Sequence, residues 1–544
     1  MRRLFAFAIA AMAATGCRDR QQVDLIVHHG KVFTVDNTFS TAEAFAVKDG
    51  KIVAIGKTYD ILYAYKGTEM VDAKGYPVYP GLIDAHAHFV GYGRSLFEVN
   101  LYDAKNWDEV IDRLQRFAKQ HPAEKWLRGR GWDQNKFPGK AYPDNTKLNQ
   151  LFPNTPVLLD RVDGHAAIAN DAALKAAGIT TSTPVSGGEI EQKDGKLTGL
   201  LVDNAVDLVT GIIPKSGKAD YEKWLTEAQK NCFAQGLTTI TDCGLMYYDI
   251  DMIDTLQKQQ KLQMKLYVML TDSAVNFARY LAKGPYKTDR LYVKGVKAYA
   301  DGALGSRGAC LLQPYTDKPG SYGFLLNPIS HYDSLAAMLV NTDFQLCTHA
   351  IGDSGNRMVL NVYNKYLKGK NDKRWRIEHA QVVNPADFEL FGKASIIPSV
   401  QPTHATSDMY WAAERLGTER IKGAYAYRQL MQQNGWIPLG TDFPVEDISP
   451  FKTFFAAVIR KDAKGEPKGG FQPDNSLTRE QALRGMTIWA AKANCMEKEV
   501  GSIEVGKKAD FFILNRDLMT ATEEELKDIM VFTTFINGER VYGQ

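Results

Sequence analysis

The sequence predicts an α/β protein: a (β/α)8 TIM-like barrel with a composite β-sandwich domain from both termini and an inserted subdomain. Over the middle of the chain, short apolar runs alternate with helix-like stretches, which is the pattern of βα units and a parallel sheet. Eight runs are candidates for barrel strands, the number that closes such a barrel. They are residues 78–88, 236–242, 265–271, 293–301, 345–350, 374–380, 396–401 and 436–442.

Strand-like segments mark both ends of the chain. Residues 23–56 alternate short apolar pieces with turns at residues 29–30 and 48–51, which is a hairpin pattern. The same pattern of short apolar pieces separated by turns occurs near the C-terminus, in GSIEVGKKADFFILN and VFTTFINGERVYG. We therefore predict a barrel domain and one composite β-domain, with these bounds: residues 76–489 for the barrel, and residues 22–75 and 490–544 for the β-domain.

The first two predicted barrel strands are separated by a gap that is too long for a loop. Within it, WLRGRGWDQNKFP and PVLLDRVDG include strand-like pieces, and SGGEIEQKDGKLTG has the pattern of a hairpin. We predict an inserted subdomain over residues from about 100 to about 225, close to the barrel mouth.

The N-terminal segment MRRLFAFAIAAMAATGC has the pattern of a secretory signal. Arg2 and Arg3 precede an apolar stretch that is too short to cross a membrane, and small residues end at Cys17. The tetrapeptide ATGC resembles a bacterial lipobox, with Ala14 in place of the usual leucine. We predict a lipoprotein signal peptide over residues 1–17 and lipid attachment at Cys17; simple secretion is the alternative. The expected location is a membrane-anchored lipoprotein in the periplasm or at the cell surface.

The charge and the cysteines exclude other classes of protein. Lysine plus arginine number 66 against 63 aspartates plus glutamates, and no basic block stands out, so we expect no nucleic-acid partner. The six cysteines are scattered without CxxC spacing, which argues against a disulfide framework. We expect most of them to be small buried apolar side chains.

Histidines gather where the predicted barrel strands end. In GLIDAHAHF, His86 and His88 are two residues apart and therefore face the same side of a strand. His349 ends the fifth strand, His379 the sixth, and Asp442 the eighth. Imidazole and carboxylate are suitable ligands for Zn²⁺ and similar ions. If GLIDAHAHF is considered alone, two structural histidines are as good an explanation as a metal site. The histidines and the aspartate at the ends of the later strands favour the metal site.

Five further motifs are DGALGSRGA (301–309), HAIGD (349–353), EHAQ (378–381), SVQPTHATSD (399–408) and GTDFPVE (440–446). Together with PGLIDAHAH, they resemble the exoenzyme-like branch of the amidohydrolase superfamily over nearly the whole chain. This resemblance implies a metal-dependent hydrolase that cleaves an amide-type C–N bond, other than a peptide bond, in a small molecule. The implied cofactor is one or two divalent ions, with Zn²⁺ expected first and Fe²⁺ or Mn²⁺ accepted by the same ligands.

The resemblance adds a lysine to the metal ligands. Lys297 lies in the fourth predicted strand and matches a family position where a lysine carboxylated by CO2 bridges two metals. A salt-bridged lysine, paired with Asp301, or a lysine that supports a single-metal site is the alternative, because a free buried ammonium is costly. We expect Asp84, deeper in the first strand, to orient its neighbours by hydrogen bonds. The implied ligand set is His86, His88, Lys297, His349, His379 and Asp442.

The resemblance also implies a catalytic set. Asp442 matches the aspartate that takes a proton from the metal-activated water and returns it to the leaving group. His404, which follows the seventh strand, is expected to hold the substrate carbonyl or the leaving group. His165, in the DGH of the insertion, is expected to face the metals. For both histidines a structural role is the alternative.

Three residues are predicted to bind the substrate. Trp132 and Asp133, in RGWDQNKFP, are candidates for a pocket wall and a polar handle, with packing as the alternative. Asp301, which shares a strand face with Lys297, completes the set. The substrate itself is not predicted, because specificity lies in loops and in the insertion.

Two other functions remain as alternatives. A deaminase or a cyclic-amide hydrolase uses the same barrel, and a non-catalytic surface binding protein would keep the scaffold without turnover. The expected partners are a small-molecule amide substrate and, through the lipid anchor at Cys17, a membrane. A homodimer is kept among the expected forms.

Overall fold

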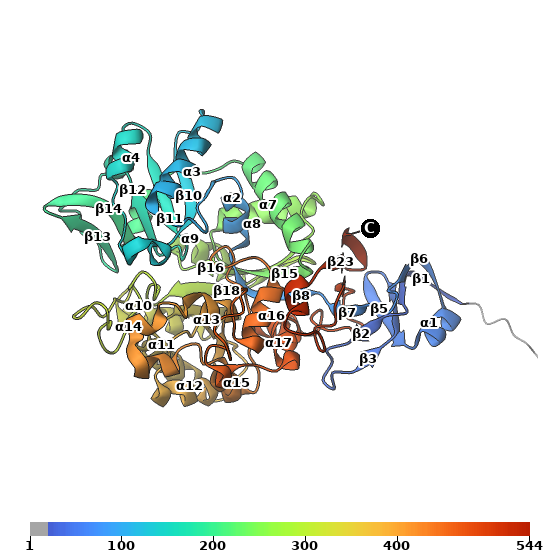
Figure 1. Cartoon of the computed structure of the whole chain (residues 1–544). Coiled ribbons are helices and arrows are strands. Elements are labelled where there is room, and N and C mark those ends of the chain that lie inside the picture. Colours follow the sequence, from blue (N-terminus) through green and yellow to red (C-terminus); the bar gives the residue numbers. More distant parts are fainter. Residues whose placement is uncertain (1–19, 544) are drawn as a thin grey trace, which may run out of the picture.

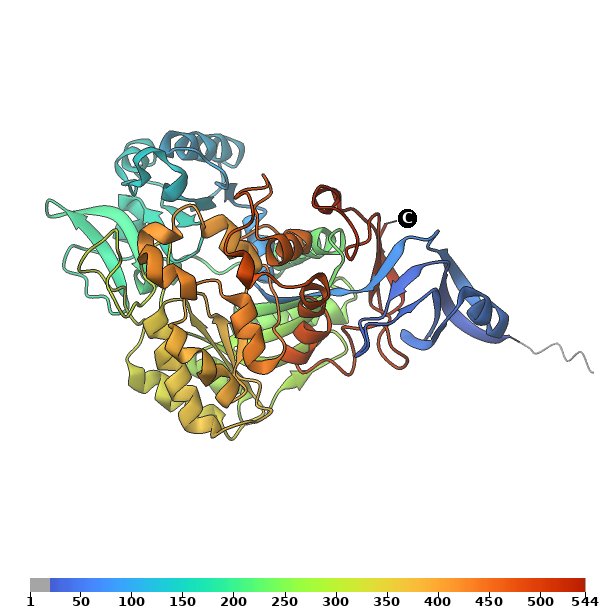
Figure 2. The same ribbon diagram turned by 60° about the horizontal axis from the view of Figure 1, so that its bottom comes forward.

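The computed structural model describes residues 20–543, and the predicted lipidation site Cys17 lies outside them. A parallel barrel sheet forms the centre of the molecule (Figure 1). In both ribbon views, the insertion and the N-terminal strands lie at opposite ends of this barrel (Figures 1 and 2). Among the described residues, no helix is long and apolar enough to cross a membrane.

Seven of the eight predicted barrel strands are confirmed. Each pairs in parallel with the next, and a short antiparallel strand, β17 (Tyr286–Lys287), lies beside the fourth. The order along the sheet is β8 (Leu82–Ala87), β15 (Leu237–Leu245), β16 (Lys265–Thr271), β18 (Leu291–Tyr299), β19 (Gln345–Ala350), β20 (Arg376–His379) and β21 (Ile397–Ser399).

The eighth predicted strand does not form a regular strand, although the segment lies where that strand was expected. The segment 436–442 runs between β21 and β8 and nearly closes the barrel, with a single bridge from Val400 to Leu439. The Ala85 amide donates to the Leu439 carbonyl at 3.2 Å. Pro438 has no amide hydrogen to donate to a ladder, and Asp442 has a left-handed φ of 63°, so regular pairing ends early.

The first predicted barrel strand, 78–88, is also split. Its beginning belongs to β7 (Pro77–Pro80), which pairs with strands of a different sheet, and only β8 enters the barrel. Both halves are fully buried, so an uninterrupted apolar run hides the change of sheet.

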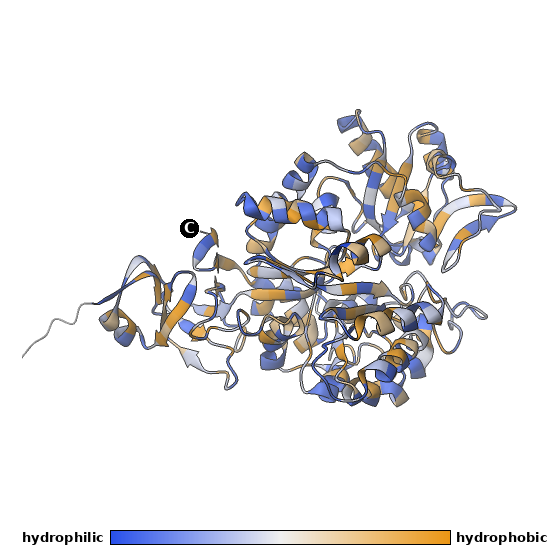
Figure 3. Cartoon of the chain, turned by 180° about the vertical axis from the view of Figure 1, so that it is seen from behind, coloured by the Kyte–Doolittle hydropathy of each residue, from blue (hydrophilic) through white to orange (hydrophobic). Residues whose placement is uncertain are grey.

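Helices follow the barrel strands and cover their outer face. On β16, Leu266, Val268 and Leu270 pack in the cluster shared with these helices, whereas Tyr267 and Met269 point into the barrel. Figure 3 shows hydrophobic residues recurring along the strands and hydrophilic ones on the surrounding helices and loops. The helices are α2 (Phe89–Ser95), α7 (Lys218–Phe233), α8 (Tyr247–Lys258), α9 (Ala274–Tyr280), α10 (Ile329–Leu339), α11 (Asp353–Leu367), α12 (Phe388–Lys393), α13 (Pro402–Asp408), α14 (Ala412–Arg420), α15 (Tyr427–Asn434), α16 (Pro450–Ile459), α17 (Arg479–Gly485) and α18 (Ile488–Ala493).

The insertion has its own six-stranded sheet and its own apolar clusters. The predicted hairpin SGGEIEQKDGKLTG is confirmed as β13 and β14, joined by a turn with left-handed Asp194 and Gly195. The strands are β9 (Val99–Asn100), β10 (Leu127–Trp132), β11 (Val157–Arg161), β12 (Ala166–Ala169), β13 (Gly188–Lys193) and β14 (Lys196–Asp203). The helices are α3 (Trp107–Gln120), α4 (Thr146–Leu151), α5 (Asp171–Ala176) and α6 (Asn204–Thr210).

Two further sheets hold the terminal segments. One has the order β5-β4-β1-β6, and the other, β24-β23-β22-β7-β2-β3, pairs C-terminal with N-terminal strands. The bounds of the composite domain stay a prediction. The elements are β1 (Gln21–His28), β2 (Lys31–Phe33), β3 (Thr41–Ala42), β4 (Ala44–Lys48), β5 (Lys51–Gly56), α1 (Thr58–Ala64), β6 (Tyr65–Asp72), β22 (Phe511–Leu514), β23 (Val531–Ile536) and β24 (Glu539–Tyr542).

One of the two predicted N-terminal turns forms a hairpin. The turn at residues 48–51 joins β4 to β5, as expected. The turn at residues 29–30 does not form one, because β1 and β2 belong to different sheets and His29 has a left-handed φ of 51°. The short 3-10 helices of the chain are η1 (Gln134–Lys136), η2 (Pro138–Lys140), η3 (Pro385–Asp387), η4 (Ile421–Gly423), η5 (Pro473–Asn475) and η6 (Glu525–Asp528).

Candidate metal centre

Four histidines and an aspartate converge at the carboxyl ends of the barrel strands. His86 lies in β8 with His88 just after it, His349 lies in β19, and His379 ends β20. The ring centroids of His86 and His379 are 4.7 Å apart, and those of His349 and His379 are 4.6 Å apart. Asp442 completes the group from the segment that closes the barrel. The structure therefore brings together the residues that the sequence predicts as metal ligands.

His86 is held in one orientation by a buried carboxylate. Its Nδ1–H donates to Glu378 Oε2, and Glu378 in turn forms an ion pair with Arg376, with 2.7 Å between Nε and Oε1. This leaves Nε2 of His86 free to bind a metal. Burial lowers the pKa of His86 to about 4, so the ring is the neutral imidazole that a metal requires.

The rings of His379 and His349 are fixed in similar ways. Nδ1 of His379 donates to the side-chain oxygen of Gln401 at 2.7 Å, which leaves Nε2 available. Nε2 of His349 lies 3.4 Å from the Gly302 carbonyl, which leaves Nδ1 available. Burial lowers the pKa of both histidines well below its usual value, so both rings are neutral at physiological pH.

Asp442 supplies an unsatisfied acceptor at the centre of the group. Its Oδ1 is buried without a hydrogen-bond partner and lies 3.2 Å from His88 Nε2 and 3.6 Å from His86 Nε2. Its Oδ2 lies 3.2 Å from His404 Nε2. Burial alone would raise the pKa of Asp442, but the hydrogen bond from His404 and the close contact with His88 hold it well below the usual value. A buried carboxylate oxygen facing neutral imidazoles fits a divalent metal ion.

Lys297 lies inside this group. Its Nζ is buried, 3.4 Å from His86 Nε2 and 4.8 Å from the centre of the Tyr299 ring. Within residues 20–543, no carboxylate oxygen lies close enough to form an ion pair with it. The alternative of a salt bridge to Asp301 is therefore not observed, since Asp301 instead accepts hydrogen bonds from backbone amides.

Asp84 supports the site from one layer below, as expected. Its Oδ1 accepts from the His86 amide at 3.1 Å and from the Thr441 amide at 3.0 Å, and its Oδ2 accepts from the Thr441 hydroxyl at 2.6 Å. Asp84 thus ties β8 to the closing segment, which carries Asp442.

Comparison with known proteins assigns the family. The model of the amidohydrolase family matches residues 69–542. The chain belongs to the amidohydrolase family. It is 32% identical to protein LONG AFTER FAR-RED 3 of Arabidopsis thaliana, over 95% of this chain and 91% of that one. It is 26% identical to N-substituted formamide deformylase of Arthrobacter pascens, over 95% of this chain and 98% of that one.

A solved structure agrees with this assignment. An uncharacterized metal-dependent hydrolase from Pyrococcus horikoshii superposes with a TM-score of 0.76 at 27% identity, covering 92% of this chain and 99% of that one. The amidohydrolase family is metal-dependent, and the donor set described above is consistent with that property.

Two further histidines of this amidohydrolase lie at the rim of the metal ligands. His404 bridges two carboxylates, with Nδ1 3.0 Å from Glu446 Oε1 and Nε2 near Asp442. His165 comes from the insertion and its Nδ1 lies 2.6 Å from Asp203 Oδ1. Its ring centroid lies 4.9 Å from that of His349, so the insertion reaches the barrel site.

The three predicted substrate-binding residues lie in buried positions, with contacts inside the protein. Trp132 is fully buried in the core of the insertion, and its indole N–H donates to the Leu159 carbonyl at 2.7 Å. Asp133 accepts from Arg161 at 2.6 Å. Asp301 is buried behind His349, 3.7 Å from its Nε2. Packing and internal hydrogen bonds occupy these side chains, as in the packing alternative, and a substrate-binding role for them stays a prediction.

Sequence reasoning missed the residues that orient the ligands. Glu378 and Arg376 share the inner face of β20 by the period of two, which is a signal that the sequence contains. Gln401 and Glu446 lie within the motifs SVQPTHATSD and GTDFPVE, but nothing in the sequence pairs them with a histidine. Cys243 lies in none of the motifs. Cys243 lies beside His86 and Glu378, and burial raises the pKa of its thiol well above the usual value, so it stays a neutral thiol.

The prediction that most cysteines are buried and unpaired is confirmed for the described residues. The five cysteines that the structure describes are free, and three of them are buried: Cys232, Cys243 and Cys347.

Proposed function

We propose that this amidohydrolase cleaves an amide-type C–N bond of a small molecule, such as an N-acyl or N-formyl amine, with Zn²⁺ as its metal. The observation that carries the proposal is the group formed by His86, His88 and the unpartnered Oδ1 of Asp442. The rings of His379 and His349 lie beside this group. When bound, a divalent ion lowers the pKa of a water toward about 7 and polarises the substrate carbonyl.

Asp442 is the proton carrier in this proposal. Its Oδ1 faces the histidines that would hold the metal, so Oδ2, which lies 3.2 Å from His404 Nε2, is the oxygen proposed to take the proton of the attacking water. The same atom then returns the proton to the leaving nitrogen as the C–N bond breaks. The low pKa of Asp442 keeps it ionised and ready to accept that proton.

His404 and His165 position the substrate. Burial alone would lower the pKa of His404, but its hydrogen bonds with Asp442 and Glu446 raise it well above its usual value. The imidazolium therefore aligns Asp442 and adds positive charge where a carbonyl oxygen becomes an oxyanion. Asp203 orients His165 so that its Nε2 is the nitrogen available to the substrate.

Lys297 is proposed to carry a carbamate. Its protonated Nζ would lose one proton, bond to the carbon of CO2 and release a second proton, so that a costly buried cation becomes a carbamate whose oxygens would hold a metal. The absence of a carboxylate partner within the described residues supports this change. A ¹³C carbonyl signal after growth in ¹³C-bicarbonate, present in the native protein and absent in Lys297→Ala, would support the carbamate; no signal in either would contradict it.

The protein is further proposed to be exported and anchored through a lipid on Cys17. The signal-like segment ending in ATGC supports this. Radioactive palmitate should label the native chain in its host and should not label Cys17→Ala. Equal labelling of both chains, or labelling of neither, would contradict the anchor.

A substrate screen on metal-stripped and reloaded protein tests the proposed reaction. Protein treated with a chelator should lose activity toward N-acyl and N-formyl amines, and Zn²⁺ should restore it. Release of ammonia from amino-heterocycles without amide cleavage would favour the deaminase alternative. Full activity of rigorously metal-free protein would exclude the proposed mechanism.

A further inference from the structure

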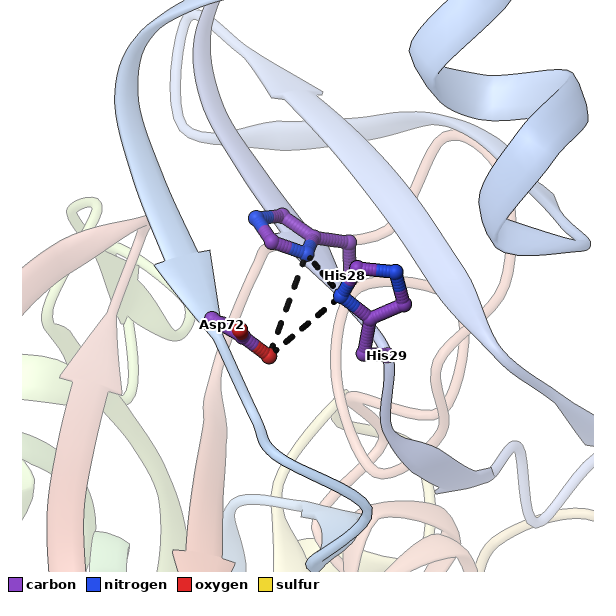
Figure 4. Close-up of side chains that lie close together, drawn as sticks. All are labelled: His28, His29 and Asp72. Carbon is purple, nitrogen blue, oxygen red and sulfur yellow. Dashed lines mark hydrogen bonds and ion pairs between the residues drawn. The ribbon is translucent and has the colours of Figure 1, made fainter.

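A second cluster of metal-type ligands lies far from the barrel mouth, in the N-terminal sheet. His28 ends β1 and Asp72 ends the parallel neighbour β6, where the two residues are register partners. His29 follows directly, and Figure 4 shows both imidazole rings directed toward the Asp72 carboxylate. None of the three takes part in the hydrolysis proposed above.

An unusual backbone brings the two adjacent histidines to one side. Neighbouring residues in a strand normally point to opposite faces. His29 instead has a left-handed φ of 51°. This conformation is fixed on both sides, since its amide donates to Thr58 Oγ1 at 2.9 Å and its carbonyl accepts from the Gly75 amide at 2.6 Å.

The distances between the ligand atoms suit a single ion. The two Nδ1 atoms are 2.9 Å apart, and Asp72 Oδ1 lies 3.4 Å from His29 Nδ1 and 4.0 Å from His28 Nδ1. In a tetrahedral site, bonds of about 2.0–2.2 Å to one metal place neighbouring ligand atoms about 3.3–3.6 Å apart, a range that the three separations bracket. The carboxylate is also held in place, because its Oδ1 accepts from the Lys74 amide at 2.9 Å.

We propose that His28, His29 and Asp72 form a second metal site, selective for divalent transition ions of the Zn²⁺ type. Two imidazoles and one carboxylate suit such ions, whereas Ca²⁺ and Mg²⁺ require more oxygen ligands. The ion joins the ends of β1 and β6 and stabilises the turn into β2. His29 is about half exposed, with 55% of its side chain accessible, so solvent completes the coordination.

Two conservative substitutions test this site. His29→Asn removes a ligand with a residue that tolerates a left-handed φ. Asp72→Asn removes the charge and keeps an oxygen that accepts from the Lys74 amide. Matched controls are His121→Asn, at the exposed end of α3, and Asp60→Asn, on the exposed face of α1. Circular dichroism and thermal unfolding establish that each variant is folded.

The measurement is the number of Zn²⁺ ions bound per chain, from equilibrium dialysis of the full protein with elemental analysis. The native protein and both controls should saturate with one more ion than His29→Asn and Asp72→Asn. The barrel ligands are intact in all five proteins, so their contribution cancels in the comparison. An equal number of ions in all five would overturn the second site, whatever the barrel proves to catalyse.

Discussion

At the scale of single residues, the centre is defined by side chains that hold the ligands as well as by the ligands themselves. Glu378 fixes which nitrogen of His86 faces the metal, and Gln401 does the same for His379. The sequence identified the ligands from their places at strand ends. It did not identify Gln401, because a residue on another strand becomes a partner only through tertiary packing.

Glu378→Gln tests this orienting role. The amide keeps the shape but weakens its hold on His86, so metal affinity should fall by about 10- to 100-fold. It also leaves buried Arg376 without a full partner, which should lower the free energy of unfolding by about 3–5 kcal/mol. Glu497→Gln, whose partner is the partly exposed Arg374, is the matched control. Metal titration and denaturant unfolding measure both effects; unchanged metal affinity would contradict the role.

The buried carboxyl group of Asp242 should make the free energy of unfolding depend on pH. Its Oδ2 accepts from the Val90 amide at 3.0 Å, and burial raises its pKa to about 7, against about 3.9 in an unfolded chain. Its contribution to stability is therefore fully present below about pH 4 and is lost as the pH rises through about 7. Asp242→Asn does not titrate there, so between pH 4 and 8 it should gain up to about 4 kcal/mol relative to the native protein.

Denaturant unfolding at both pH values checks this, with metal content held constant. Exposed Asp60→Asn controls for the general loss of a carboxylate. An equal difference between Asp242→Asn and the native protein at pH 4 and pH 8 would contradict the burial argument.

At the scale of elements, the closing segment 436–442 is the part that the sequence predicts least well. Apolar runs predict the seven regular strands because these strands are buried on both faces over most of their length. The eighth run looks the same, but Pro438 and the left-handed Asp442 depend on local backbone geometry that an apolar pattern does not report. The irregular backbone of this segment has a structural consequence, because it directs the Asp442 side chain toward the histidines.

Gly440→Ala tests how closely this segment approaches β8. A Cβ at this position would lie 2.5 Å from the His86 amide nitrogen, so the backbone must move. Unfolding free energy should fall by about 1–3 kcal/mol or more, and metal affinity should fall with it. Gly56→Ala, where the nearest atom is 3.9 Å away, is the control. Native-like stability and metal affinity in Gly440→Ala would show that the approach is not critical.

At the scale of the whole molecule, the sequence predicted barrel strands in the middle of the chain and strands at both ends. One sheet, β24-β23-β22-β7-β2-β3, joins strands from the two ends, while the bounds of the composite domain stay a prediction. The split of the predicted strand 78–88 between two sheets did not follow, because both halves are equally apolar. Trp132 shows why substrate-binding residues are hard to predict from sequence. An aromatic residue next to polar ones has the pattern of a pocket wall, but this side chain packs in the core of the insertion.

The central claim is that Asp442 carries the proton in a metal-dependent hydrolysis at the barrel mouth. The most direct measurement is kcat for Asp442→Asn on the best substrate of the screen, together with its metal content. Asp447→Asn, a neighbouring exposed carboxylate paired with Lys452, is the control. We predict nearly unchanged metal content and a kcat lower by about 10²- to 10⁴-fold for Asp442→Asn. A kcat equal to that of the native protein would contradict the claim.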